Sequence, residues 1–137
     1  MSKTAGFTLI CTDTIAASAV VGTVGAVNMT RSALFASQTE ITVPNNQTWT
    51  IWDFYILVAA GSGTSDPMVN VQKNLDTQMI LTPNLSSLLV SNNSRPKFAA
   101  MNIGYRPTDI LTMLLETTVA NDTAQDAIAF RAAVMVS

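Results

Sequence analysis

Residues 41–60 read ITVPNNQTWTIWDFYILVAA, and this stretch decides the expected fold. A short apolar run ends at residues 44–47, Pro-Asn-Asn-Gln, where proline fixes φ and asparagine tolerates positive φ. We therefore expect a tight turn at these four positions. The run at residues 48–60 is rich in tryptophan, tyrosine, phenylalanine and isoleucine, which favour strands over helices. The stretch therefore predicts two strands joined by a turn.

Strict alternation along residues 48–60 divides the side chains of the longer strand between two faces. The two sets are Trp49, Ile51, Asp53, Tyr55 and Leu57, and Thr50, Trp52, Phe54, Ile56 and Val58. Both sets are largely apolar, so the strand is expected either in the centre of a sandwich or with its outer face against another subunit. One tryptophan is expected in the core. The other would anchor a subunit interface or stack on a sugar, and the interface is favoured because tryptophan is enriched at interfaces.

Strand-like runs separated by turn clusters continue to the C-terminus. The expected strands lie within residues 39–43, 48–60, 68–72, 77–81, 86–90, 97–103, 109–120 and 127–137. Short strands at this spacing predict an all-β antiparallel sandwich or barrel. Seven or eight strands after residue 38 fit an eight-stranded jelly roll. We see no internal repeat, linker or second domain.

The N-terminal residues 1–38 are expected to form an extended arm, and residues 39–137 the β-sandwich domain. Small and β-branched residues dominate from Phe7 to Val27, and Gly22 and Gly25 weaken a helical interpretation. An extended arm or a pair of strands is therefore predicted. Whether it packs on its own sandwich or on a neighbouring subunit is left open. The two faces expected from alternation are Thr8, Ile10 and Thr12, and Phe7, Leu9 and Cys11.

The composition is poor in charge. Charged residues make up 12% of the 137 positions, against about 25% in an ordinary domain. Little electrostatic repulsion then keeps copies apart, which suits a subunit covered by its neighbours. The net charge is −2 and the seven basic residues are spread along the chain, so direct nucleic-acid binding is not expected. The uncharged run at residues 14–30 is too weakly hydrophobic to predict a membrane span.

The residues for common enzyme chemistry are missing. The chain has no histidine and one cysteine, which excludes Ser-His-Asp and Cys-His arrangements and the usual zinc ligands. We therefore expect no enzyme, no catalytic residues, no cofactor and no metal site. Cys11 is expected to be a buried, reduced thiol. Five Asn-x-Ser/Thr sequons are interpreted as chance in a chain rich in these residues, at Asn28, Asn46, Asn84, Asn92 and Asn121.

Residues 36–56, ASQTEITVPNNQTWTIWDFYI, resemble the opening of small β-sandwich domains on phage and virus particles. Such domains carry a strand ending in Val-Pro, a polar turn and then Thr-Trp-x-Ile. Residues 66–74, DPMVNVQKN, stand where these domains place a following strand. The resemblance is to jelly-roll cement, decoration or small capsid proteins of double-stranded DNA phages and viruses. It implies a structural protein of the virion shell or its outer surface, without catalytic residues.

The expected partners are copies of the same chain, as a trimer or pentamer, and other capsid proteins. The candidate interface residues are Phe7, Leu9, Ile10, Trp49, Trp52 and Phe54. Two alternatives remain open. One is a filament or pilus-like subunit that polymerises by adding its N-terminal strand to a neighbour. The other is a carbohydrate-binding β-sandwich module that uses an exposed tryptophan.

Overall fold

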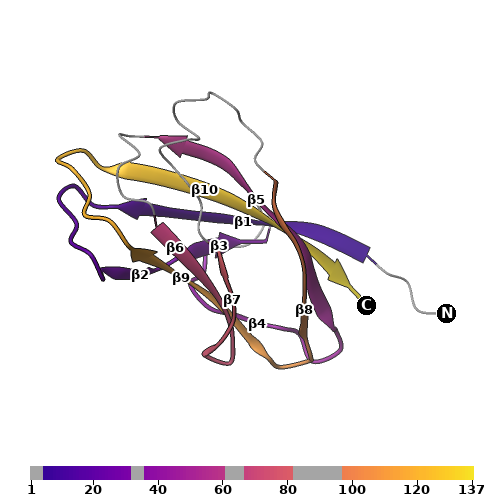
Figure 1. The fold of residues 1–137 in the computed structure, drawn as a ribbon. Helices are drawn as coiled ribbons and strands as arrows, with labels where there is room; N and C mark the ends of the chain where they lie inside the picture. The colour runs from indigo at the N-terminus through magenta and orange to yellow at the C-terminus, as the bar shows by residue number, and fades with distance from the viewer. Residues whose placement is uncertain (1–4, 32–35, 61–66, 82–96) are drawn as a thin grey trace.

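The computed structural model describes residues 5–31, 36–60, 67–81 and 97–137 (Figure 1). These residues form strands and connecting turns, and the part of the chain described here contains no helix that could cross a membrane. The expected strand at residues 86–90 lies outside the described residues. The strands are β1 (Ala5–Ile15), β2 (Val24–Ala26), β3 (Asn28–Thr30), β4 (Ile41–Thr42), β5 (Trp49–Ala60), β6 (Pro67–Lys73), β7 (Asp76–Leu81), β8 (Lys97–Tyr105), β9 (Ile110–Thr117) and β10 (Asp126–Val136).

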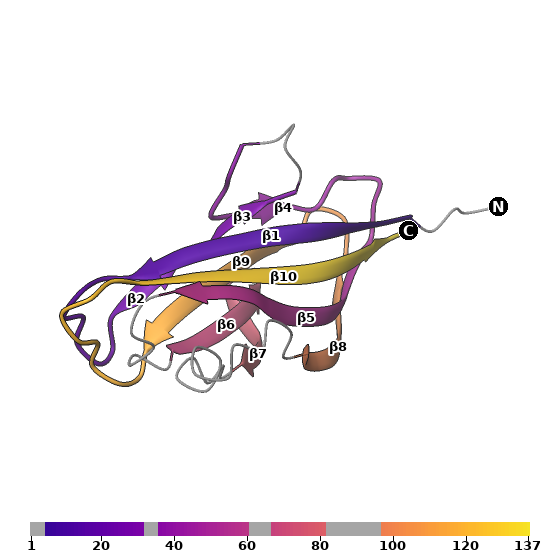
Figure 2. The same cartoon turned by 90° about the horizontal axis from the view of Figure 1, so that it is seen from above.

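Two antiparallel sheets make up the molecule. Sheet A has the strand order β3-β1-β10-β5-β8, and sheet B has the order β2-β9-β6-β7, with β4 also paired to β9. Figure 2 shows β1, β10 and β5 side by side in one layer, with β9, β6 and β7 in the other. The prediction of an all-β antiparallel sandwich, jelly-roll-like in arrangement, is therefore confirmed.

The core lies between the sheets because alternate residues of each strand point inward. Its largest fully buried side chains come from both sheets: Trp49, Tyr105, Phe54, Phe130, Leu9, Met29, Ile51, Leu111 and Met113. The polar turn expected at residues 44–47 is present, and the backbone N–H of Gln47 donates to the carbonyl oxygen of Pro44 at 3.1 Å. This turn brings the chain into β5.

The N-terminal segment is extended, as predicted, but its described strands lie within the sandwich of their own chain. β1 pairs with β10 along its whole length, from Ala5 opposite Val136 to Ile15 opposite Asp126. The side chains of Leu9 and Cys11 are fully buried in the core. Of the two arrangements that the sequence left open, the described strand β1 therefore has the one in which it packs on its own chain. The physical reason is that the inward face of β1 is apolar and completes sheet A beside the C-terminal strand.

A β-bulge at Trp52 corrects the alternation expected along β5. On β10, Val134 lies opposite Ile51 and the next residue, Ala133, lies opposite Asp53, so Trp52 has no partner of its own. An extra residue in one strand of a pair reverses the alternation beyond it. Phe54 is therefore buried on the same face as Trp49 and Ile51, whereas Trp52 is on the outer face.

Asn121 joins the loop after β1 to the loop after β9. Its Nδ2 donates to the carbonyl oxygens of Ala16 and Ala124, both at 2.9 Å, and the residue is buried. A glycan on Nδ2 would replace one donated hydrogen and would need room that a buried site lacks. The sequon at Asn121 therefore has a structural role in the folded protein.

Cys11 gives a first test of the core. Its Sγ lies 3.9 Å from Sδ of Met113, and burial raises the pKa of the thiol to about 12, although the positive charge of Arg131 partly opposes this. The thiolate is the reactive form of cysteine. We expect an aromatic disulfide reagent to leave the native protein unmodified at pH 8 and to label one thiol per chain in denaturant. Rapid labelling of the native protein would contradict the burial of β1.

Candidate functional site

The outer face of sheet A carries several small side chains. It is formed by the outward residues of three neighbouring strands: Thr8, Ile10 and Thr12 of β1, Ala129, Arg131, Ala133 and Met135 of β10, and Thr50, Trp52 and Asp53 of β5. Alanine and threonine dominate this surface, so another layer could approach it closely. Sheets that pack face to face lie about 10 Å apart.

Two large apolar side chains are exposed on this face. Trp52 is 48% exposed and Met135 is 42% exposed. Thr50 lies opposite Met135 and Asp53 lies opposite Ala133, so Trp52 sits beside this pair of β10 residues. Neighbouring exposed apolar side chains of this size mark interaction surfaces. The outer face of sheet A is therefore the candidate interface.

The structure separates the predicted interface residues into two groups. Leu9, Trp49 and Phe54 are fully buried in the core, where they hold the two sheets together and cannot reach another molecule. Ile10 and Trp52 share the outer face of sheet A, and Phe7 is half-buried at one end of the core. The interface itself stays a prediction, and of the predicted residues Ile10 and Trp52 are the ones that face outward.

Sequence reasoning missed the contribution of β10 to this face. Residues 126–136 alternate strictly between buried positions and outward positions, which include Ala129, Arg131 and Met135. This period of two was visible in the sequence and could have been used. The outward position of Asp53 could not be predicted from the sequence in this way, because it depends on the bulge.

Trp49 is held by a cluster of named contacts. Its ring meets that of Phe7 edge to face, with centroids 5.0 Å apart and an interplanar angle of 72°. The guanidinium carbon of Arg31 lies 4.9 Å from the centroid of the Trp49 ring. The indole Nε1 donates to Oε1 of Gln47 at 2.9 Å. This tryptophan is the core tryptophan that the sequence predicted, and its one polar atom is satisfied.

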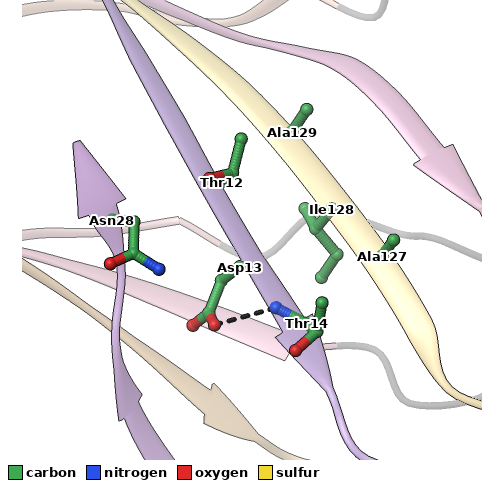
Figure 3. Close-up of a pocket in the computed structure, with 7 residues that line it drawn as sticks. All are labelled: Thr12, Asp13, Thr14, Asn28, Ala127, Ile128 and Ala129. Carbon is green, nitrogen blue, oxygen red and sulfur yellow. Dashed lines mark hydrogen bonds between the residues drawn. The ribbon is translucent and has the colours of Figure 1, made fainter. Parts of the chain in front are cut away.

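An open pocket of about 300 Å³ lies at the far end of β1. Its lining residues are Thr12, Asp13, Thr14, Asn28, Ala127, Ile128 and Ala129. Figure 3 shows Asp13 and Asn28 extending toward one another between β1 and β3, while Thr12 points away. Oδ1 of Asp13 accepts a hydrogen bond from the backbone N–H of Thr14 at 2.8 Å. Burial raises the pKa of Asp13, and that hydrogen bond partly opposes the shift.

Replacing Asp13 with asparagine is expected to stabilise the fold at neutral pH. The folded-state pKa is raised above its ordinary value of 3.8, so the folded protein binds the proton more tightly than the unfolded chain does. The ionised group then destabilises the fold above that value, and stability recovers as the pH falls through the folded-state pKa. Thermal melts of Asp13→Asn and the parent should differ at pH 7 and converge in acid.

Asp109 provides a control of opposite sign. Its pKa is lowered, first by the hydrogen bond from the backbone N–H of Arg106 and then by that from Nδ2 of Asn74. Asp109→Asn should therefore lower the melting temperature at pH 7, and this loss should shrink in acid. A loss of stability in Asp13→Asn at neutral pH would contradict the assigned environment of Asp13.

The described residues contain no group of three or more histidine, cysteine, aspartate or glutamate side chains placed to hold a metal ion. The pocket at Asp13 offers a single carboxylate with an amide and hydroxyl groups. General acid–base chemistry in a hydrolase commonly needs a second carboxylate or a histidine nearby.

The two-sheet architecture defines the chain as a jelly-roll-like β-sandwich protein. No family model matches the sequence, and a search of curated proteins also found no match. Among solved structures, the chain is similar to murine APRIL, with 12% identity over 92% of this chain and 98% of that one and a TM-score of 0.49. Pika GITRL has 16% identity over 88% and 94%, with a TM-score of 0.38.

A chain in the acidic stable capsid structure of Helicobacter pylori bacteriophage KHP30 is also similar. It has 12% identity over 97% of this chain and 93% of that one, with a TM-score of 0.40. These likenesses lie at the level of the β-sandwich, and they carry no inference about function.

Proposed function

We propose that the protein is a structural subunit of a virion shell, as a capsid or cement protein, and that it assembles with copies of itself. The observation that carries the proposal is the outer face of sheet A, where Trp52 and Met135 are exposed close to one another. Tryptophan and methionine are both enriched in protein interfaces. The protein would have no enzymatic activity and would act by occupying its place in the shell.

The energetics favour a subunit that is covered by neighbours. Burial of apolar surface stabilises by about 25 cal/mol per Å² before the free energy of association is subtracted. A chain with 12% charged residues offers little repulsion against this gain. Repeated symmetric contacts in a shell then add to one another through multivalency. The sequence resemblance of residues 36–56 to virion β-sandwich domains supports the same location.

The first experiment is the molar mass of the unmodified protein across concentration, by light scattering coupled to size exclusion. We expect a discrete dimer, trimer or pentamer, or larger closed particles visible by electron microscopy. A monomer that persists at millimolar concentration would overturn the proposal. Open-ended growth would instead support a filament.

A second candidate function rests on the exposed indole of Trp52. An aromatic ring on a sheet face can stack on a sugar, and 48% of this side chain is exposed. A carbohydrate-binding module would bind sugars on a glycan array, and Trp52→Ala would abolish that binding. Trp49 is buried and therefore cannot stack on a sugar. No binding by the parent protein removes this candidate.

The filament alternative receives no support from the position of β1. Strand addition requires an N-terminal strand that is free to enter a neighbour, whereas β1 pairs with β10 of its own chain over its whole length. Deleting residues 1–30 would also remove Leu9, Cys11 and Met29 from the core. We therefore expect that deletion to unfold the protein.

A further inference from the structure

The outer face of sheet A carries two opposite charges on neighbouring strands. Arg131 lies on β10, opposite Ile10 of β1, and Asp53 lies on β5, opposite Ala133 of β10. Among the outward residues of β1, β10 and β5 given above, Arg131 and Asp53 are the charged ones. At the edge of the sheet, Lys97 of β8 lies opposite Tyr55, which in turn lies opposite Arg131. Arg131 and Asp53 are therefore diagonal neighbours, because Asp53 lies opposite Ala133, two residues along β10 from Arg131.

Arg131 is incompletely satisfied in the isolated chain. Its Nε is buried and has no hydrogen-bond partner. A buried donor without a partner destabilises the fold, so a native structure usually supplies the missing acceptor. A guanidinium pairs best with a planar carboxylate, through two parallel hydrogen bonds. The missing partner is therefore expected to be anionic.

Asp53 supplies a carboxylate on the same face. The bulge at Trp52 turns Asp53 outward, beside the exposed indole. Its Oδ1 accepts from the backbone N–H of Phe54 at 2.9 Å, which fixes the orientation of the carboxylate. Among the residues that the structure describes, no hydrogen bond is recorded for Oδ2. Asp53 is 8% exposed, so only a small part of this residue is open to a partner.

We propose that two copies of the chain pack outer face to outer face about a two-fold axis, with Arg131 of each copy paired to Asp53 of the other. This inference rests on the proposed self-assembly and names its contact. A two-fold interface brings the same patch of each subunit together, so a surface with adjacent positive and negative groups is complementary to itself. Alanine and threonine on both faces let the two sheets approach.

A charge-swap experiment tests the contact. Arg131→Asp and Asp53→Arg each place like charges at both symmetric pairs, and each is expected to raise the dissociation constant at least about 30-fold. The double variant restores opposite charges and should return the dissociation constant to within a few-fold of the parent. The readout is the dissociation constant from light scattering or analytical ultracentrifugation, with the far-ultraviolet spectrum confirming the fold.

Two further variants keep the test interpretable. Asp53→Asn retains the acceptor for the Phe54 N–H and removes only the charge, so it should weaken association without unfolding the chain. Arg106→Asp makes the same charge change as Arg131→Asp in the exposed turn after β8, and it should leave the dissociation constant unchanged. An equal effect of both arginine variants would overturn the assigned contact and indicate a general effect of net charge.

The outcomes for the two proposals differ. A parent protein that stays monomeric contradicts both the proposed function and this contact. A parent that assembles, with Arg131→Asp and Asp53→Asn assembling equally well, overturns the contact and leaves the proposed function standing. Weakened single variants with a restored double variant would establish the pairing.

Discussion

Trp49→Ala is expected to lower the free energy of unfolding by about 3–5 kcal/mol, the usual range for removing a large aromatic side chain from a core. The side chain is fully buried, and its removal would leave a cavity beside Phe7. It would also remove the indole ring that the guanidinium group of Arg31 packs against. Domains of this kind are stable by about 5–15 kcal/mol in total, so the variant would lose a large part of its stability. Urea unfolding followed by circular dichroism measures the change.

Trp52→Ala is the matched control for stability. It removes the same side chain three positions along the same strand, but from the outer face. The expected change in the free energy of unfolding is about 0.5 kcal/mol or less, as for other surface substitutions. Equal losses for the two variants would show that Trp49 and Trp52 do not lie on opposite sides of sheet A.

The same Trp52→Ala variant, which is expected to leave stability almost unchanged, is expected to weaken self-association strongly. Truncating an interface tryptophan at a hot spot typically costs about 2 kcal/mol or more, which raises the dissociation constant about 30-fold. Trp52 is the largest exposed apolar side chain on the outer face of sheet A. Sedimentation equilibrium across concentration would measure the weakening, with the melting temperature of the dilute monomer recorded alongside.

Ile80→Ala provides the control for this prediction. Ile80 is an exposed apolar residue on β7 of the other sheet, so removing it also lowers surface hydrophobicity. Association should be unchanged in this variant if the outer face of sheet A is the interface. Equal weakening by both substitutions would mean that association is non-specific.

Most of the strand pattern could be predicted because it is local. The period of two and the turn residues lie within a few positions of one another, and they placed β6, β7, β9 and β10 close to the observed bounds. The division of β1 into two faces and the burial of Cys11 were also predicted, whereas Leu9 was expected at an interface and is buried on the same face as Cys11. A strand with one apolar face carries this information in its own residues.

The partner of β1 could not be predicted in the same way. Its inward face is apolar, which is compatible with packing on its own chain or on a neighbour. The choice depends on β10, at the opposite end of the sequence, which lies directly beside it (Figure 1). Pairing between distant segments is a property of the whole sheet, and local propensity does not encode it.

By itself, the sequence determined the fold class, the low charge and the absence of histidine chemistry, because these follow from composition and short-range pattern. Only the tertiary structure decided which residues face outward on β5. The bulge at Trp52 forms against β10 and β8, and it moves Phe54 into the core and Asp53 to the outer face beside Trp52. A bulge is an irregularity of pairing between two strands, so no single strand's alternation reveals it.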